Sequence, residues 1–122
     1  MPDDASVLDS NAIGDSVRRF VAQHSSFARV RAQRGELPGF SRDIWRAMAE
    51  AGWFGVLLPE DDGGLGLSLS DAAEIAGGLA AGLFPEPFTA AAVLPLTLLS
   101  ALAPSAIRDD LIAGLLAGDT IA

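Results

Sequence analysis

The sequence predicts an all-α fold, a bundle of about five helices with one irregular Gly-rich loop. Apolar residues recur at helical spacing in several segments. Capping residues, glycines and prolines separate these segments, and none has the alternating pattern of a half-buried strand. Half of the 122 residues are apolar and 20% are charged, a composition that can bury a core and that excludes a disordered chain. We expect one helical domain at residues 11–122, after a flexible N-terminus at residues 1–10.

The first helix is expected to begin after Asp9 or Ser10, because either side chain can cap a helix. Its apolar face consists of Ile13, Val17, Phe20, Val21 and His24. Residues 25–39 are less regular, and we predict a frayed helix end followed by a loop. The arginines of this stretch form either a small anion site or a solvated face; they are Arg29, Arg31 and Arg34.

The second helix has clear signals at both ends. Ser41 is a good N-cap, and Gly52 can adopt the left-handed conformation that ends a helix. Its apolar face consists of Ile44, Trp45 and Met48. Residues 54–59 then form an apolar run that is too short for a helix and that Pro59 ends. In residues 60–70, two aspartates and two glycines follow Glu60, so we expect a loop there.

The third helix is expected to start at Asp71, which forms a capping-box pattern with Glu74. Its apolar stripe consists of Ala72, Ile75, Ala76, Leu79, Ala80 and Leu83. Three glycines interrupt the stripe, and we expect them to allow close approach to another element; they are Gly77, Gly78 and Gly82. The segment Phe84–Phe88 ends the helix, because its two prolines cannot continue it.

The fourth helix is expected from about Thr89 to Leu102 and is apolar nearly all round, which predicts burial on most sides. Pro95 lies inside it, so the helix either starts late, with Pro95 in its first turn, or is kinked there. A fifth helix begins after Ser105 and ends at Gly118. Its face consists of Ile107, Leu111, Ile112, Leu115 and Leu116.

Composition excludes several classes of function. Sixteen acidic residues against eight basic ones give a net charge of −8, which argues against binding nucleic acid or anionic membranes. There is no cysteine, hence no disulfide, thiolate nucleophile or zinc–thiolate site. Residues 1–10 lack the pattern of a signal peptide. The longest apolar stretch, Ala90–Ala103, is shorter than the ~20 residues of a membrane span, and we expect a cytoplasmic protein.

The motifs that could carry chemistry are incomplete. The loop at Gly63–Gly66 lacks the G-x-G-x-x-G fingerprint, because Leu69 stands where the last glycine is needed. The carboxylate pairs Asp61/Asp62 and Asp109/Asp110 stand at turns or helix starts, where acids are expected for local reasons. His24 has no second His, Cys or base nearby in the sequence. We therefore assign no catalytic, cofactor-binding or metal-binding residue to this chain.

The segment Trp45–Glu60, WRAMAEAGWFGVLLPE, followed by Asp61–Ser68, DDGGLGLS, resembles the N-terminal helical domain of acyl-CoA dehydrogenases. The most specific part is Pro59-Glu60 followed by Gly63-Gly64-Leu65-Gly66. The Phe-Pro-Glu-Pro-Phe junction and the closing Gly118–Ala122 are similar to those of the family as well. Two positions depart from the family pattern. The usual Glu-Glu-Leu-Gly reads Gly77-Gly78-Leu79-Ala80, and Asp62 replaces a frequent tyrosine.

The resemblance implies an FAD-dependent enzyme that introduces an α,β double bond into an acyl-CoA thioester. It implies that domains outside this chain bind FAD and carry the catalytic glutamate. This domain would pack on a flavin-binding β-domain and on a C-terminal helical domain or partner subunit, in a homo- or hetero-oligomer. Related flavin oxidases and monooxygenases share the same N-terminal domain. The alternative is a non-catalytic helical interaction module from a truncated or split gene.

The candidate substrate-binding residues lie at the junction before the fourth helix and in its first turns. They are Phe84, Pro87, Phe88, Ala91 and Ala92. Two aromatic residues flank two rigid prolines, and the alanines that follow keep one helical turn narrow, as the rim and floor of a groove require. The resemblance implies an acyl-binding wall at the same place. Ordinary packing between helices is the alternative, because Ala and Phe suit a core equally well.

Overall fold

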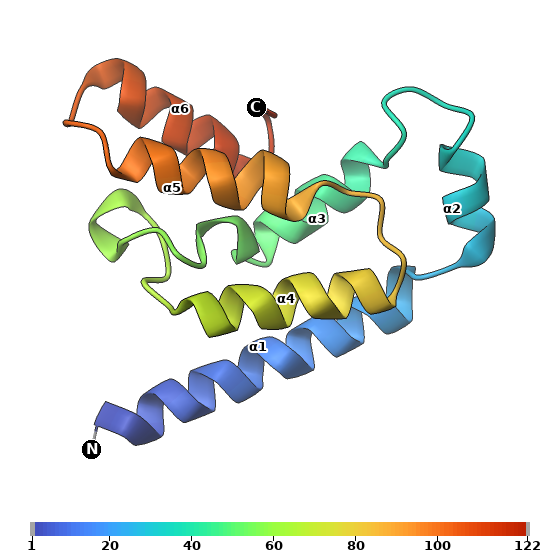
Figure 1. Ribbon diagram of the computed structural model, residues 1–122, viewed down its shortest axis with the longest axis horizontal. Coiled ribbons are helices and arrows are strands. Elements are labelled where there is room, and N and C mark those ends of the chain that lie inside the picture. Colours follow the sequence, from blue (N-terminus) through green and yellow to red (C-terminus); the bar gives the residue numbers. More distant parts are fainter. Residues whose placement is uncertain (1, 122) are drawn as a thin grey trace. The chain divides into compact units, whose positions relative to one another are not determined.

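The computed structural model describes residues 2–121, with side chains from residue 11 onward. Within that part of the chain it contains six α-helices and no strand (Figure 1), which confirms the predicted all-α class. The helices are α1 (Pro2–His24), α2 (Phe27–Gln33), α3 (Arg42–Glu50), α4 (Leu69–Ala81), α5 (Leu94–Ser100) and α6 (Ala106–Ala117). Short 3-10 turns occur at η1 (Trp53–Gly55) and η2 (Glu60–Asp62), and a π-helical turn at η3 (Thr89–Val93).

The chain forms two compact units. The first contains residues 1–40 and 73–85, and the second contains residues 41–72 and 86–122. Helix α4 therefore begins in the second unit and continues in the first.

The core of the first unit lies between α1 and α4, which run side by side in Figure 1. Its buried apolar residues are Val17, Phe20, Ile75 and Leu79. A Cβ atom at Gly78 would lie 2.3 Å from Cγ1 of Val17, whereas one at Gly77 would meet nothing within 4 Å. At Gly82 a Cβ would lie 2.8 Å from the side chains of both Val21 and Phe84. The close approach predicted for three glycines therefore holds for Gly78 and Gly82 and is wrong for Gly77.

The irregular stretch after α1 is a separate helix, so the predicted frayed end is wrong. The N–H of Ser25 donates to the carbonyl of Val21 at 2.8 Å and completes the last turn of α1. The next residue, Ser26, is extended, and its Oγ accepts the N–H of Arg29 at 3.0 Å. One serine thus closes a helix and the other caps the next one.

Helix α1 begins at Pro2 and not after Asp9 or Ser10. The flexibility predicted for residues 1–10 stays a prediction, because the side chains of these residues lie outside the described part of the chain.

The second unit is built around α3 and the turn that follows it. Oγ of Ser41 accepts the N–H of Ile44 at 3.3 Å, and Gly52 is left-handed with φ of 83°, as predicted for both helix ends. The left-handed Gly52 lets the chain reverse, so that the side chains after it return to the core. The largest fully buried side chains of this unit are Trp45, Met48, Trp53, Phe54, Val56 and Leu96.

Helix α4 starts two residues earlier than predicted, because Ser68 and not Asp71 is the cap. Oδ2 of Asp71 accepts both the N–H and the hydroxyl of Ser68, at 3.0 and 2.8 Å. In return, Oγ of Ser68 accepts the N–H of Asp71 at 3.3 Å. This is a capping box of the Ser-x-x-acid type, three residues before the predicted one.

Pro95 lies in the first turn of α5, preceded by the π-helical turn η3. Of the two alternatives for this helix, the late start is the observed one. Burial of α5 is less than predicted: Leu96 is buried, but Leu94, Leu98 and Leu102 are each more than half exposed. On α6, Ile112 and Leu115 are buried as expected, whereas Ile107 and Leu111 are exposed. In both helices the described chain covers only one side.

Candidate functional site

The five predicted substrate-binding residues belong to a continuous segment that runs from the end of α4 into η3. Phe84 belongs to the first unit, and Pro87, Phe88, Ala91 and Ala92 belong to the second. Phe84 and Pro87 are half-buried. Phe88, Ala91 and Ala92 are buried by the chain itself. Each part of the segment is held by different contacts.

The chain turns sharply before Phe84. The N–H of Phe84 donates to the carbonyl of Leu79, and that of Leu83 donates to the carbonyl of Ala80, at 3.1 and 3.0 Å. This is the hydrogen-bond pattern of a Schellman turn, whose C′ residue is left-handed and usually glycine. Here that residue is Leu83, with φ of 56° and half of its surface exposed.

The Phe84 ring is fixed by two contacts within the first unit. Its centroid lies 5.7 Å from that of Phe20, and the guanidinium carbon of Arg29 lies 4.7 Å from the Phe84 centroid. The second contact is a cation–π interaction. Of the three arginines proposed as an anion site or a solvated face, Arg29 thus covers an aromatic ring, while Arg31 and Arg34 are exposed.

Glu86, between the two prolines, is an anchor that sequence reasoning missed. Its carboxylate is buried, and Oε2 accepts the backbone N–H of Ser41 at 2.9 Å. Ser41 is itself the N-cap of α3, so Glu86 fixes the junction to the start of that helix, where a negative charge is favourable. The signal in the sequence was a single acid inside an otherwise apolar and Pro-rich run.

Pro95 explains the π-helical turn η3, which precedes it in the chain. Proline has no N–H, and its ring clashes with the carbonyl four residues before it, here that of Ala91. The wider turn changes the register, and the N–H of Leu94 donates to the carbonyl of Thr89. Turns of this kind are frequent at functional sites. The methyl groups of Ala91 and Ala92 face the interior of the chain, and Ala90 and Leu94 face outward.

The carboxylate pairs and the glycine loop have structural roles. Asp62 and Asp109 both accept hydrogen bonds from the buried Arg108. In the loop, five consecutive N–H groups from Gly63 to Leu67 donate to backbone carbonyls of residues 55–60. These amides are therefore engaged inside the chain and cannot cradle a phosphate.

The described residues 11–121 contain no cluster of His, Asp or Glu side chains that could hold a metal ion. His24 packs against the ring of Phe20, with 4.5 Å between ring centroids. Within the same residues, no helix is long and apolar enough to cross a membrane. Within the second unit, Phe88, Ala91 and Ala92 form a buried apolar segment. Among the described side chains there is no set for acid–base or nucleophilic catalysis.

Comparison with known proteins agrees with this description. The family model described as "Acyl-CoA dehydrogenase, N-terminal domain" matches residues 9–119. The chain is 34% identical over 93 residues to the acyl-CoA dehydrogenase IpdE2 of Mycobacterium tuberculosis, covering 75% of this chain and 29% of the relative. It is 32% identical over 87 residues to IpdE2 of Mycolicibacterium smegmatis, covering 70% and 28%.

A solved structure shows the same fold. It is a variant of the steroid acyl-CoA dehydrogenase Tcur3481-Tcur3483, with a TM-score of 0.79 and 26% identity, covering 93% of this chain and 31% of that chain. The chain thus spans less than a third of the length of the relatives it matches.

Proposed function

The chain belongs to the acyl-CoA dehydrogenase family, as its N-terminal helical domain, and from this we propose that it forms part of the acyl-binding wall of an FAD-dependent dehydrogenase. That enzyme would introduce an α,β double bond into an acyl-CoA thioester. Flavin-binding and C-terminal domains outside this chain, or in a partner subunit, would complete it. The match over residues 9–119 is the observation that carries the proposal.

The contribution of this chain would be to bind and orient the acyl group and to exclude water. The junction from Phe84 to Phe88 suits this task, because its prolines are rigid, its first residue is held by a ring contact and its central residue, Glu86, is held by a hydrogen bond. Of the five candidate residues, Phe84 and Pro87 reach the surface and would contact the acyl group. Ala91 and Ala92 are buried within the second unit, and their small side chains would leave room for the acyl group.

The flavin, when bound, would supply the oxidising power of the reaction. The glycine loop and Arg108 do not fit its phosphates, because the amides of the loop and the donors of Arg108 are already bonded within the chain. We therefore assign no step at the flavin to this chain.

For the acyl group we propose a bulky, ring-bearing one. The support is the neighbouring structure, whose name describes a steroid acyl-CoA dehydrogenase. The same name gives two designations, Tcur3481 and Tcur3483, and on this basis we propose a hetero-oligomer as the assembly. The equivalent domain of a flavin oxidase or monooxygenase, and a free-standing interaction module, remain the competing functions.

Substitution of Pro87 tests the acyl wall in the complete enzyme. Pro87→Leu places a larger, flexible side chain on the proposed wall. We expect kcat/KM for a ring-bearing acyl-CoA to fall about tenfold relative to that for butyryl-CoA. Ala101→Leu, at the exposed far end of α5, is the control and should leave the ratio unchanged. Equal losses for both substrates with Pro87→Leu, in step with a lower Tm, would show that Pro87 serves packing alone.

A further inference from the structure

An apolar groove lies at the corner between α5 and α6, within the second unit. Its volume is about 620 Å³, within the range of ligand pockets. Its apolar lining consists of Leu102, Pro104, Ile112, Ala113 and Leu116. Leu102 also belongs to the exposed leucine row, which we define as Leu94, Leu98 and Leu102. Leu94 and Leu98 are four residues apart on one face of α5, and Leu102 lies just beyond the end of that helix.

The polar groups beside the leucine row are already satisfied. The hydroxyl of Thr97 donates to the carbonyl of Val93 at 2.7 Å, and that of Ser100 donates to the carbonyl of Thr97 at 2.8 Å. No charged residue occurs between Glu86 and Arg108. The surface that this face exposes to water is therefore mainly apolar. Contiguous exposed apolar patches mark interaction sites.

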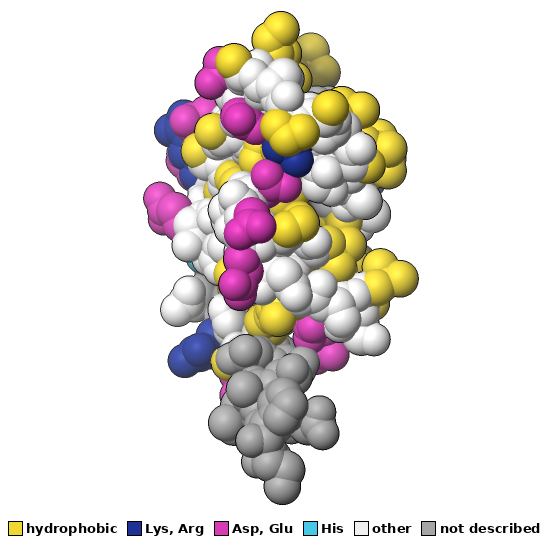
Figure 2. All heavy atoms as spheres, turned by 90° about the vertical axis from the view of Figure 1, so that its left-hand side faces the viewer, with side chains coloured by type: hydrophobic (Ala, Val, Ile, Leu, Met, Phe, Trp, Pro, Cys, Tyr) yellow, Lys and Arg dark blue, Asp and Glu magenta, His cyan; other side chains and the backbone are white. Residues whose placement is uncertain are grey.

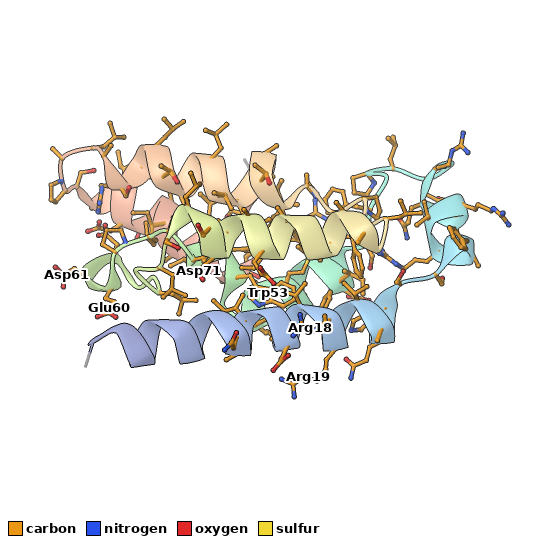
Figure 3. The ribbon with its side chains drawn as sticks, turned by 60° about the horizontal axis from the view of Figure 1, so that its bottom comes forward. Arg18, Arg19, Trp53, Glu60, Asp61 and Asp71 are labelled. Atoms are coloured by element: carbon orange, nitrogen blue, oxygen red, sulfur yellow. The ribbon has the colours of Figure 1, made fainter. Side chains whose placement is uncertain are left out.

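The rim of the groove is acidic. Asp61, Asp62 and Asp109 line it together with a single basic residue, Arg108. Figure 2 shows acidic side chains beside hydrophobic ones on this face, and Figure 3 shows Glu60 and Asp61 pointing away from their turn. Three carboxylates against one guanidinium leave the rim with two negative charges.

Arg108 cannot bind an anion in the groove, because its donors are in use. Its Nε donates to the carbonyl of Leu99 at 2.9 Å, and its two Nη atoms donate to Asp62, Asp109 and the carbonyl of Ser100. The hydrogen bond with Asp62 is the main cause that raises the pKa of Arg108. The guanidinium therefore stays charged and paired, and the remaining rim attracts cations.

The net charge of the second unit also favours a basic partner. The second unit contains ten acidic and three basic residues, the first unit six and five. A second copy of this chain would bring another net charge of −8, so self-association at this rim is opposed by charge. Acyl-CoA, nucleotides and anionic lipids are opposed for the same reason.

We propose that the groove and the leucine row dock a basic, amphipathic helix of a protein partner. The apolar side chains of the partner helix would cover the leucine row. The apolar stems of its Lys or Arg side chains would pack in the groove, and their charged ends would lie at Asp61 and Asp109. That this helix belongs to the remainder of the flavoenzyme or its partner subunit rests on the proposed function. The chemistry of the helix rests on the groove alone.

Peptide binding to the full chain tests the proposal. The probe is a fluorescein-labelled helical peptide with leucines four residues apart and two arginines at one end, and the Kd is measured by anisotropy. Asp61→Asn should weaken binding about threefold. The control Glu50→Gln removes the same charge from the exposed end of α3 and should have no effect. Leu98→Gln should weaken binding, whereas Leu69→Gln, which is also exposed but belongs to neither the groove nor the leucine row, should not.

Three outcomes would overturn the docking site. The first is an equal loss of peptide affinity in the test and control variants of each pair. The second is equally tight binding of a peptide that has glutamates in place of the arginines. The third is self-association of the chain that Leu98→Gln abolishes. The last would identify a second copy as the occupant. The assay contains neither flavin nor acyl-CoA, so its result is independent of the acyl-wall proposal.

Discussion

At the scale of single residues, Leu83 is the position where the backbone is least suited to its side chain. Its φ of 56° lies in the left-handed region, which costs a residue with a Cβ about 1–2 kcal/mol. Glycine is the usual solution at the end of a helix. Strained residues of this kind cluster at functional sites, and Leu83 directly precedes the first residue of the proposed acyl wall.

We expect Leu83→Gly to raise the free energy of unfolding by about 0.5–1 kcal/mol, because relief of the strain exceeds the added entropy of the unfolded chain. Urea titration measures it. Ala80→Gly, exposed inside α4, is the control and should cost about 1 kcal/mol. If both variants lose stability equally, the Leu83 side chain contributes packing that outweighs its strain.

Residue types that satisfy one local hydrogen bond were predictable from the sequence. Ser41, Gly52, Ser105 and Gly118 lie at the helix ends where they were expected, with capping bonds or positive φ values. Leu83 was not predictable, because nothing in a leucine indicates a left-handed conformation. Glu86 was missed because the partner of its carboxylate, the N–H of Ser41, is 45 residues away in the sequence.

At the scale of elements, the two adjacent glycines of α4 should respond to the same substitution with opposite signs. Gly77→Ala adds a methyl group in open space and should raise the free energy of unfolding by about 0.5–1 kcal/mol. Gly78→Ala places a Cβ 2.3 Å from Val17 in a buried contact, and overpacking there should cost about 1–3 kcal/mol. Thermal or urea unfolding measures both. A stabilising Gly78→Ala would contradict the close approach of α1 and α4.

Element boundaries were less predictable than element type. Helix α2 was missed because adjacent serines resemble a loop, although one of them caps a helix. The start of α4 was misplaced because Asp71 is the reciprocal partner in the capping box and not the cap. Burial of α5 was overestimated, because composition shows that a helix is apolar but not whether the same chain covers it.

At the scale of the whole molecule, two observations are consistent with each other: the leucine row is exposed, and the chain spans only part of the length of its relatives. The chain matches less than a third of each relative, and one side of α5 and of α6 lacks cover among the described residues. The fold and family were predictable because they depend on local signals and on the Pro-Glu and Gly-Gly-x-Gly run. The docking groove was not, because Asp61, Leu102 and Arg108 converge only after folding.

The most direct test of the central claim, that this is a domain of an acyl-CoA dehydrogenase, is anaerobic reduction of the flavin in the complete enzyme. We predict that addition of an acyl-CoA, fastest for a ring-bearing one, bleaches the flavin absorbance without any other reductant. A flavin that no acyl-CoA bleaches, but that a reduced nicotinamide cofactor does, would contradict the account and identify the monooxygenase alternative.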